Sequence, residues 1–181
     1  MTSVTRRRLL AAGAMLPVIP AFAQSRPLTC GALTDAQTAG PFFKTNTPLR
    51  ASLIEPGSKA PRLVVTGQVL SARCTPVANA LLDFWHADED GEYDNSGFRY
   101  RGHQFTDAQG HYRLATIVPA EYPGRTRHIH VKVQAPGKRV LTTQLYFPGD
   151  PGNAKDGLYE HALEMRMAKA AEGTFDFVVE A

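Results

Sequence analysis

Short runs of hydrophobic, β-branched and aromatic residues recur along the chain, and each run is bounded by turn-forming residues. Runs of that length and composition are typical of β-strands. Six segments fit the pattern, namely residues 62–70, 80–86, 111–118, 128–134, 139–147 and 174–179. Residues 107–110 and 135–138 have the composition of hairpin turns. Gly and Pro are spread along the chain rather than pooled in a linker, so we expect one domain.

Residues 156–171 follow a different pattern, because their hydrophobic residues recur at helical spacing. The residues that carry this spacing are Leu158, Leu163 and Met167. Several short strands followed by one late helix favour an all-β fold, an antiparallel β-sandwich. Residues 88–102, which are rich in Asp, Gly and Asn, form a long excursion between two strands. Long excursions in compact domains are often functional.

The first 23 residues differ from the rest of the chain. Arg6, Arg7 and Arg8 precede an uncharged apolar stretch that ends in Ala-Phe-Ala at residues 21–23. A basic start, a short apolar run and an Ala-x-Ala pattern are typical of a secretory signal peptide. Twin arginines followed by Leu-Leu resemble the signal of the twin-arginine export route. We therefore expect cleavage after residue 23, a mature domain of residues 24–181, and a periplasmic or secreted location.

The net charge of the chain falls from +3 to zero once this segment is removed. The full sequence has 20 Lys and Arg against 17 Asp and Glu, a net charge of +3, which by itself would suggest a nucleic-acid partner. The whole excess lies in the three N-terminal arginines, so the mature chain is formally neutral and we expect no nucleic-acid partner. We expect no permanent membrane span, because the apolar run is short and Pro17 and Pro20 would interrupt a spanning helix.

The two cysteines, Cys30 and Cys74, are too few for a disulfide scaffold or a four-cysteine zinc site. In an oxidising compartment they could form a single disulfide. Two buried free thiols are the alternative, and the spacing alone does not choose between them. The sequence also leaves the oligomeric state open, and a homo-oligomer is compatible with it.

His128-Ile129-His130 is the sharpest local indication of chemistry. Alternate side chains of a strand share a face, so both imidazoles point the same way, roughly 7 Å apart at Cβ. That arrangement lets both bind one metal ion. For His-x-His alone, the alternative is a pair of hydrogen-bonded surface histidines. The loop that leads into this strand carries Tyr122 and Arg125.

With these neighbours, the sequence resembles the intradiol ring-cleavage dioxygenases, which are the non-haem ferric catechol and protocatechuate dioxygenases. The matching residues run in order through most of the mature chain: TAGPFF at 38–43, DFWHAD at 83–88, GEY at 91–93, FRYRGHQFTD at 98–107, TIVP at 116–119, YPGR at 122–125, HIH at 128–130 and TQLYF at 143–147. The resemblance implies one ferric ion per chain, held by Tyr93, Tyr122, His128 and His130.

The chemistry of ferric iron agrees with that set of ligands. Fe(III) is a hard ion that prefers anionic oxygen, which phenolate supplies, and imidazole also suits iron. The pKa of a free tyrosine is about 10, so only a strong local cation would keep Tyr93 and Tyr122 deprotonated at neutral pH. Two phenolates also favour ferric over ferrous iron, because they neutralise two of its three charges.

The resemblance also implies a reaction and further site residues. A catechol and O2 would react so that the ring opens between its two hydroxyl-bearing carbons, giving a muconate-type diacid. Arg125 would stabilise negative charge on the bound catecholate. Tyr122 would be the ligand that the substrate displaces, and Gln144 would have a polar or orienting role near the iron. Gly40 and Pro41 match the segment that lines the substrate pocket.

Other interpretations fit the sequence less well. His86 stands where related enzymes carry glutamine, and we interpret it as a hydrogen-bonded structural histidine. A cupin-type site would need a glutamate shortly after His-x-His, and residues 131–135 contain none. A non-catalytic β-sandwich binding module of the cell envelope is the alternative from a different class. It would have no reason to combine both tyrosines and both histidines with Arg125.

Overall fold

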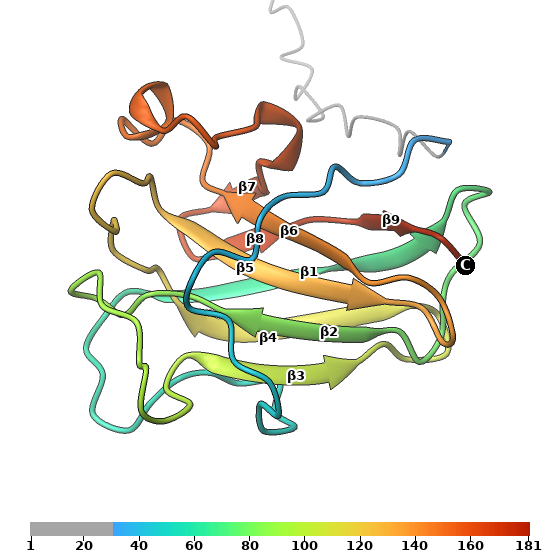
Figure 1. The fold of residues 1–181 in the computed structure, drawn as a ribbon, viewed down its shortest axis with the longest axis horizontal. Coiled ribbons are helices and arrows are strands. Elements are labelled where there is room, and N and C mark those ends of the chain that lie inside the picture. Colours follow the sequence, from blue (N-terminus) through green and yellow to red (C-terminus); the bar gives the residue numbers. More distant parts are fainter. Residues whose placement is uncertain (1–30) are drawn as a thin grey trace, which may run out of the picture.

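The computed structural model describes residues 31–181, which form two stacked β-sheets (Figure 1). One sheet contains β1 (Arg62–Ser71), β4 (His111–Ile117), β7 (Arg166–Lys169), β8 (Glu172–Thr174) and β9 (Phe177–Val179). The other contains β2 (Leu81–Trp85), β3 (Arg101–Phe105), β5 (His128–Gln134) and β6 (Leu141–Tyr146). The second sheet is antiparallel throughout, in the order β3-β2-β5-β6, whereas β8 and β9 run parallel to β1 in the first. The predicted all-β sandwich is confirmed.

The alternation of side chains on β5 divides the hydrophobic core from the candidate site. Ile129, Val131 and Val133 are fully buried among core residues contributed by both sheets. The intervening residues, which include His128 and His130, face the outer side of the sheet. One strand therefore supplies the core with one face and the site with the other.

Residues 31–50, here called the covering segment, run across that outer face. In Figure 1 this blue-to-cyan ribbon passes in front of β6, β5 and β2. The backbone N–H of Gln37 donates to the carbonyl of Thr142 at 2.8 Å, and the Thr143 hydroxyl donates to the carbonyl of Asp35 at 2.7 Å. The covering segment is thus fastened to β6, and it buries polar residues that would otherwise face water.

All six predicted strands form, the last of them only over its final three residues. The predicted helix over residues 156–171 is wrong. This region contains the 3-10 turn η2 (His161–Leu163) and β7, and a second 3-10 turn, η1 (Asn153–Lys155), precedes it. Of the three residues that suggested a helical stripe, Leu158 is 44% exposed, Met167 is partly buried and Leu163 is buried. Met165, which was not part of the stripe, is buried as well.

The two predicted turns have different outcomes. The turn at residues 135–138 joins the paired strands β5 and β6, and the N–H of Lys138 donates to the carbonyl of Ala135. The turn at residues 107–110 also forms, with the N–H of Gly110 donating to the carbonyl of Asp107. It is not a hairpin, however, because it links β3 of one sheet to β4 of the other.

Several predictions concern residues before 31. The signal sequence, its cleavage site and Cys30 all lie outside the described residues. Cys74 is disulfide-bonded, so the free-thiol alternative is wrong for this residue. Within residues 31–181, no helix has the length and apolar character needed to cross a membrane.

Candidate metal centre and its surroundings

Three potential metal-binding atoms converge under the covering segment. Nε2 of His128 lies 3.1 Å from Nε2 of His130 and 3.2 Å from the phenolic oxygen of Tyr93. The histidines come from β5, and Tyr93 comes from the excursion between β2 and β3. All three residues are buried, with exposed fractions of 4%, 3% and 7%. The alternative of two surface histidines is therefore wrong.

Both histidines have the protonation state that metal binding requires. Nδ1 of His128 lies 2.6 Å from the carbonyl oxygen of Thr126, which can only accept, so Nδ1 carries the hydrogen and Nε2 a lone pair. Burial lowers the pKa of His128 to about 4 and that of His130 well below its ordinary value. Both imidazoles are therefore neutral at neutral pH.

The two tyrosines lie beside each other. Burial raises the pKa of Tyr93 well above its ordinary value, so its phenol keeps its proton unless a strong cation is close. Phe42 of the covering segment stacks on Tyr93, with ring centroids 4.4 Å apart. The ring of Tyr122 meets Tyr93 edge-on at 5.8 Å. Tyr122 is half-buried, so it is the more accessible phenol of the pair.

The covering segment approaches His130 closely at Gly40. A Cβ added to Gly40 would lie 3.6 Å from Cε1 and 3.9 Å from Nε2 of His130. Gly40 also has φ +64, a left-handed conformation that glycine adopts without strain. Pro41, the next residue, is exposed and belongs to the turn that follows. These are ordinary contact distances, so the left-handed backbone, rather than a lack of space, is what favours glycine beside the imidazole.

Arg125 is held beside these residues by a carboxylate and an amide. Its Nε donates to both carboxylate oxygens of Asp156, at 3.0 and 2.9 Å. Its Nη2 donates to Oε1 of Gln144 at 2.6 Å. Gln144 is fully buried on β6, where it pairs with His130 across the strands, and its Nε2 donates to the carbonyl of Thr38. The structure thus brings Gln144 to the arginine.

Sequence reasoning missed Asp156, which was placed inside the predicted helix. The Asp156-Gly157 pair is a turn signal, but the helical spacing of the neighbouring leucines outweighed it. In the structure, the carboxylate of Asp156 accepts a hydrogen bond from the N–H of Leu158 at 2.9 Å, which closes a local turn. The same carboxylate accepts a hydrogen bond from Nε of Arg125.

His86 is a structural histidine, as predicted. Its Nδ1 lies 2.7 Å from the carbonyl oxygen of Ala87, and its Nε2 lies 2.6 Å from the hydroxyl of Thr116. Because the carbonyl only accepts, Nδ1 is the donor and the threonine hydroxyl donates to Nε2. Both ring nitrogens are therefore satisfied, and burial lowers the pKa of His86 to about 4.

The donor set fits a ferric ion. Within the described part of the chain, no group of three or more His, Cys, Asp or Glu could hold a metal, so a centre here would combine imidazoles with phenols. Nε2 of His128 lies within 3.2 Å of both Nε2 of His130 and the phenol oxygen of Tyr93, and the second phenol ring is adjacent. Phenolate is the hard, anionic ligand that Fe(III) prefers.

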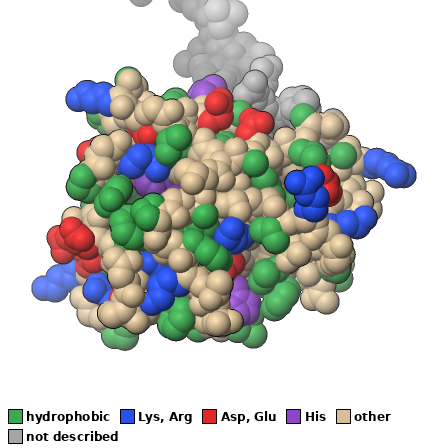
Figure 2. Space-filling model, in the orientation of Figure 1, with side chains coloured by type: hydrophobic (Ala, Val, Ile, Leu, Met, Phe, Trp, Pro, Cys, Tyr) green, Lys and Arg blue, Asp and Glu red, His purple; other side chains and the backbone are tan. Residues whose placement is uncertain are grey.

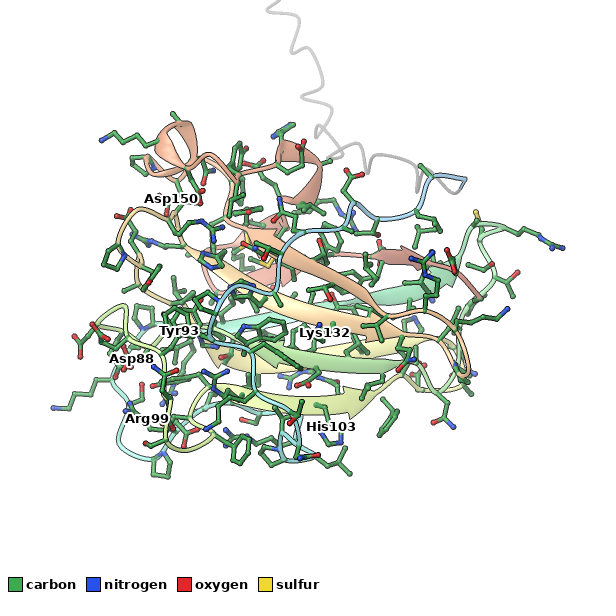
Figure 3. The ribbon with its side chains drawn as sticks, viewed as in Figure 1. Asp88, Tyr93, Arg99, His103, Lys132 and Asp150 are labelled. Atoms are coloured by element: carbon green, nitrogen blue, oxygen red, sulfur yellow. The ribbon has the colours of Figure 1, made fainter. Side chains whose placement is uncertain are left out.

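A cavity of about 400 Å³ lies against Tyr122 and Arg125. Its other lining residues include the charged side chains Asp90, Glu92, Glu121, Lys155 and Asp156. Figure 2 shows a hollow on one face of the molecule in which histidine surface lies among hydrophobic and basic side chains. Figure 3 shows Tyr93 beside the covering segment, on the same face as Lys132 of β5.

Comparison with known proteins identifies the class. Residues 38–180 match the Dioxygenase family. The chain is 33% identical over 174 residues to a chlorocatechol 1,2-dioxygenase of Pseudomonas sp. (strain P51), covering 78% of this chain and 68% of that protein. It is 38% identical over 122 residues to the protocatechuate 3,4-dioxygenase beta chain of Burkholderia cepacia, covering 57% and 52%. The chain therefore spans about half to two thirds of the length of these curated relatives.

A solved structure agrees with these matches. It is the dioxygenase domain of a dioxygenase carbohydrate-binding protein fusion from the cellulolytic bacterium Streptomyces sp. SirexAA-E. It is 54% identical, with a TM-score of 0.79, over 83% of this chain and 99% of that chain. The chain belongs to the intradiol ring-cleavage dioxygenase family, as its sequence motifs predicted.

Proposed function

We propose that the mature chain is an exported non-haem Fe(III) dioxygenase that acts on a catechol-type substrate. It would open the ring with O2 between the two hydroxyl-bearing carbons and give a muconate-type diacid. The observation that carries this proposal is that Nε2 of His128 lies within 3.2 Å of both the phenol oxygen of Tyr93 and Nε2 of His130. The names of its relatives, which are chlorocatechol and protocatechuate dioxygenases, support the substrate class.

Tyr93, Tyr122, His128 and His130 would hold the ferric ion, which when bound supplies a Lewis acid and a template for the substrate. The protein prepares this centre by burial. Both imidazoles are kept neutral, and the carbonyl of Thr126 fixes the ring orientation of His128. Tyr93 must lose its proton on metal binding, and the packing of Phe42 on its ring holds it in place.

The remaining groups act on the substrate. Arg125 would donate hydrogen bonds to negative charge that develops on the substrate oxygens. Gln144 holds the guanidinium on one side and the covering segment on the other. Tyr122, the half-buried phenol, is the residue that can give way to the substrate and take up one of its protons. Gly40 places the left-handed turn of the covering segment within contact distance of His130.

The experiment is to purify residues 24–181 with iron, record the visible spectrum, and follow O2 uptake with catechol. We expect a reddish tyrosinate-to-iron charge-transfer band and one O2 consumed per muconate-type diacid formed. Tyr93→Phe and His130→Ala should each lose iron while the protein stays folded. A colourless, zinc-loaded protein without O2 uptake would instead favour the non-catalytic binding module.

Export is tested separately. Replacement of Arg6 and Arg7 by lysine in the full-length chain should trap the protein inside the cell as an uncleaved precursor, because the twin arginines form the address. Cell fractionation and the N-terminal sequence of the exported protein report the outcome. Export of the double variant at the wild-type level would contradict the twin-arginine route without affecting the proposed reaction.

A further inference from the structure

The guanidinium of Arg125 has most of its donors already engaged. Arginine carries five N–H groups. Its Nε–H is shared by both carboxylate oxygens of Asp156, at 3.0 and 2.9 Å. Nη2 donates to Oε1 of Gln144 at 2.6 Å and to the hydroxyl of Tyr146 at 3.3 Å. Nη1 has no hydrogen-bond partner within residues 31–181, and Arg125 lines the cavity of about 400 Å³.

We propose that Asp156 is a positioning residue, which together with Gln144 turns the Nη1 edge of Arg125 toward the substrate. This inference rests on the proposed function, because it assigns Arg125 the substrate contact. The two partners grip different parts of the guanidinium, Asp156 at Nε and Gln144 at Nη2. A planar group held at two of its three nitrogens has one orientation left.

Asp156 is itself firmly held. Its side chain is 1% exposed. Besides Arg125, one carboxylate oxygen accepts the backbone N–H of Thr126 at 3.0 Å, and the other accepts that of Leu158 at 2.9 Å. The carbonyl of Thr126 in turn fixes Nδ1 of His128. The carboxylate of Asp156 therefore orients the guanidinium of Arg125. It also holds the backbone of Thr126, whose carbonyl orients the candidate metal ligand His128.

The opposite side of the guanidinium is fixed just as firmly. The hydroxyl of Tyr146 lies 2.7 Å from both Oε1 of Gln37 and the carbonyl oxygen of Leu158, and Tyr146 is fully buried. Gln144 is tied to the covering segment through the carbonyl of Thr38. Arg125 is thus clamped between the loop that carries Asp156 and the segment that covers the sheet.

The ion pair also changes what Arg125 offers the substrate. Asp156 neutralises the charge of the guanidinium, so the pair presents directed N–H donors rather than a net cation. Such donors stabilise a developing oxyanion only when they point at it. Orientation, which Asp156 supplies, is therefore the property that the reaction would need.

A neighbouring ion pair provides a matched control. Nε of Arg127 lies 3.0 Å from a carboxylate oxygen of Asp150 in an ion pair, without the geometry of a hydrogen bond, and the Asp150 side chain is 4% exposed. Arg127 lies two residues from Arg125. Asp150, which Figure 3 labels, lies in the loop after β6. Asp150→Asn therefore removes an equally buried carboxylate from an arginine of the same loop.

The test is a double-mutant cycle on iron-loaded protein with Asp156→Asn, Arg125→Gln and the combined variant. Each is measured by kcat/KM for catechol and by anaerobic titration with 4-nitrocatechol. In the wild-type background, Asp156→Asn should lower kcat/KM by about tenfold to a hundredfold, because a misplaced group loses that much. In the Arg125→Gln background the same change should cost less than about twofold. Asp150→Asn should stay within about twofold of wild type.

An equal loss in both backgrounds, or no loss in either, would overturn the positioning role. If Asp156→Asn does not fold, Asp156→Glu keeps the charge but shifts the guanidinium, and the same cycle is read with that variant. The titration separates this inference from the proposed function. A wild-type protein that binds 4-nitrocatechol in this titration but consumes no O2 when given catechol in air would refute the dioxygenase. A smaller effect of Asp156→Asn on 4-nitrocatechol affinity in the Arg125→Gln background would still support the positioning role of Asp156.

Discussion

The indole ring of Trp85 lies parallel to the imidazole of His130, with ring centroids 4.8 Å apart and planes 3° from parallel. The two residues are directly paired across β2 and β5. Trp85 is 1% exposed, and Phe43 of the covering segment packs directly against its indole, with ring centroids 4.9 Å apart. The indole therefore fixes the plane of a candidate metal ligand from the sheet itself.

Replacing Trp85 should weaken metal binding before it affects the reaction. Trp85→Ala should destabilise the fold by about 3–5 kcal/mol, because it leaves a cavity beside His130. Trp85→Phe should keep the fold but lower the affinity for iron, since a smaller ring supports the imidazole less well. Urea unfolding and competition with an iron chelator measure the two effects. Wild-type iron affinity in a folded Trp85→Phe protein would refute the support by Trp85.

Gly40→Ala tests the close approach of the covering segment to His130. The new methyl group would sit 3.6 Å from Cε1 of His130, on a backbone with φ +64. Gly57→Ala is the matched control, because Gly57 has φ +81 but nothing within 4 Å of an added Cβ. Both variants should lose about 1 kcal/mol of stability from the backbone. Only Gly40→Ala should also lower kcat/KM for catechol, and equal kinetics in the two would contradict its role.

The sequence predicts the parts of this site that depend on local pattern. Alternation on β5 places His128 and His130 on one face, and the family motifs bring Tyr93, Tyr122 and Arg125 together with them. β3 escaped prediction because Arg101 and His103, which alternate on its outer face, are polar. The covering segment covers them: the carbonyl of Phe42 accepts a hydrogen bond from Arg101, and Thr47 contacts Nδ1 of His103. That cover is a long-range packing effect, which no local pattern contains.

Asp156 escaped prediction for a related reason. Its partners Arg125 and Thr126 lie about thirty residues earlier in the chain, so only tertiary structure brings them together. The spacing of Leu158, Leu163 and Met167 favoured a helix, but in the structure Leu158 is exposed, whereas Leu163 and Met165 are buried. Tertiary packing therefore outweighed the weak helical preference of residues 156–171, in the loop whose Asp156 contacts Arg125.

The buried histidine His86 should make the fold sensitive to acid. Burial lowers its pKa to about 4, from an ordinary value of about 6.5 in the unfolded chain. Because the folded pKa is the lower one, its contribution is fully present above about pH 6.5 and is lost as the pH falls toward 4. That contribution is about 3 kcal/mol at most.

Urea unfolding of wild type and His86→Gln at pH 7 and pH 4.5 measures this effect. The glutamine variant should lose less stability between the two pH values than wild type does, since it has no proton to take up. His111→Gln is the control, because His111 is exposed. The same pH dependence in wild type and His86→Gln would show that other groups govern the acid response.

The cavity beside Arg125 predicts a preference among catechols. Asp90, Glu92 and Glu121 line it, and none of the three forms an ion pair with any residue from 31 to 181. Two of their loops are in direct contact, because a Cβ added to Gly91 would meet the carbonyl oxygen of Glu121. With Arg125 neutralised by Asp156, Lys155 is the remaining cation of the lining. The cavity therefore carries excess negative charge.

A catechol with a cationic substituent should consequently be preferred to one with an anionic substituent. We expect kcat/KM for 3,4-dihydroxybenzylamine to exceed that for 3,4-dihydroxybenzoate by about tenfold at low ionic strength, because a charged cleft concentrates ligands of opposite sign. The ratio should fall in 0.5 M salt, because the Debye length is then only about 4 Å and charges farther apart are screened from one another. The triple variant Asp90→Asn, Glu92→Gln, Glu121→Gln should reduce it as well, whereas Glu172→Gln, outside the cavity, should not. If the triple variant keeps the wild-type ratio of kcat/KM, these carboxylates do not set the preference. The metal centre itself would then determine the difference in kcat/KM between the two substrates.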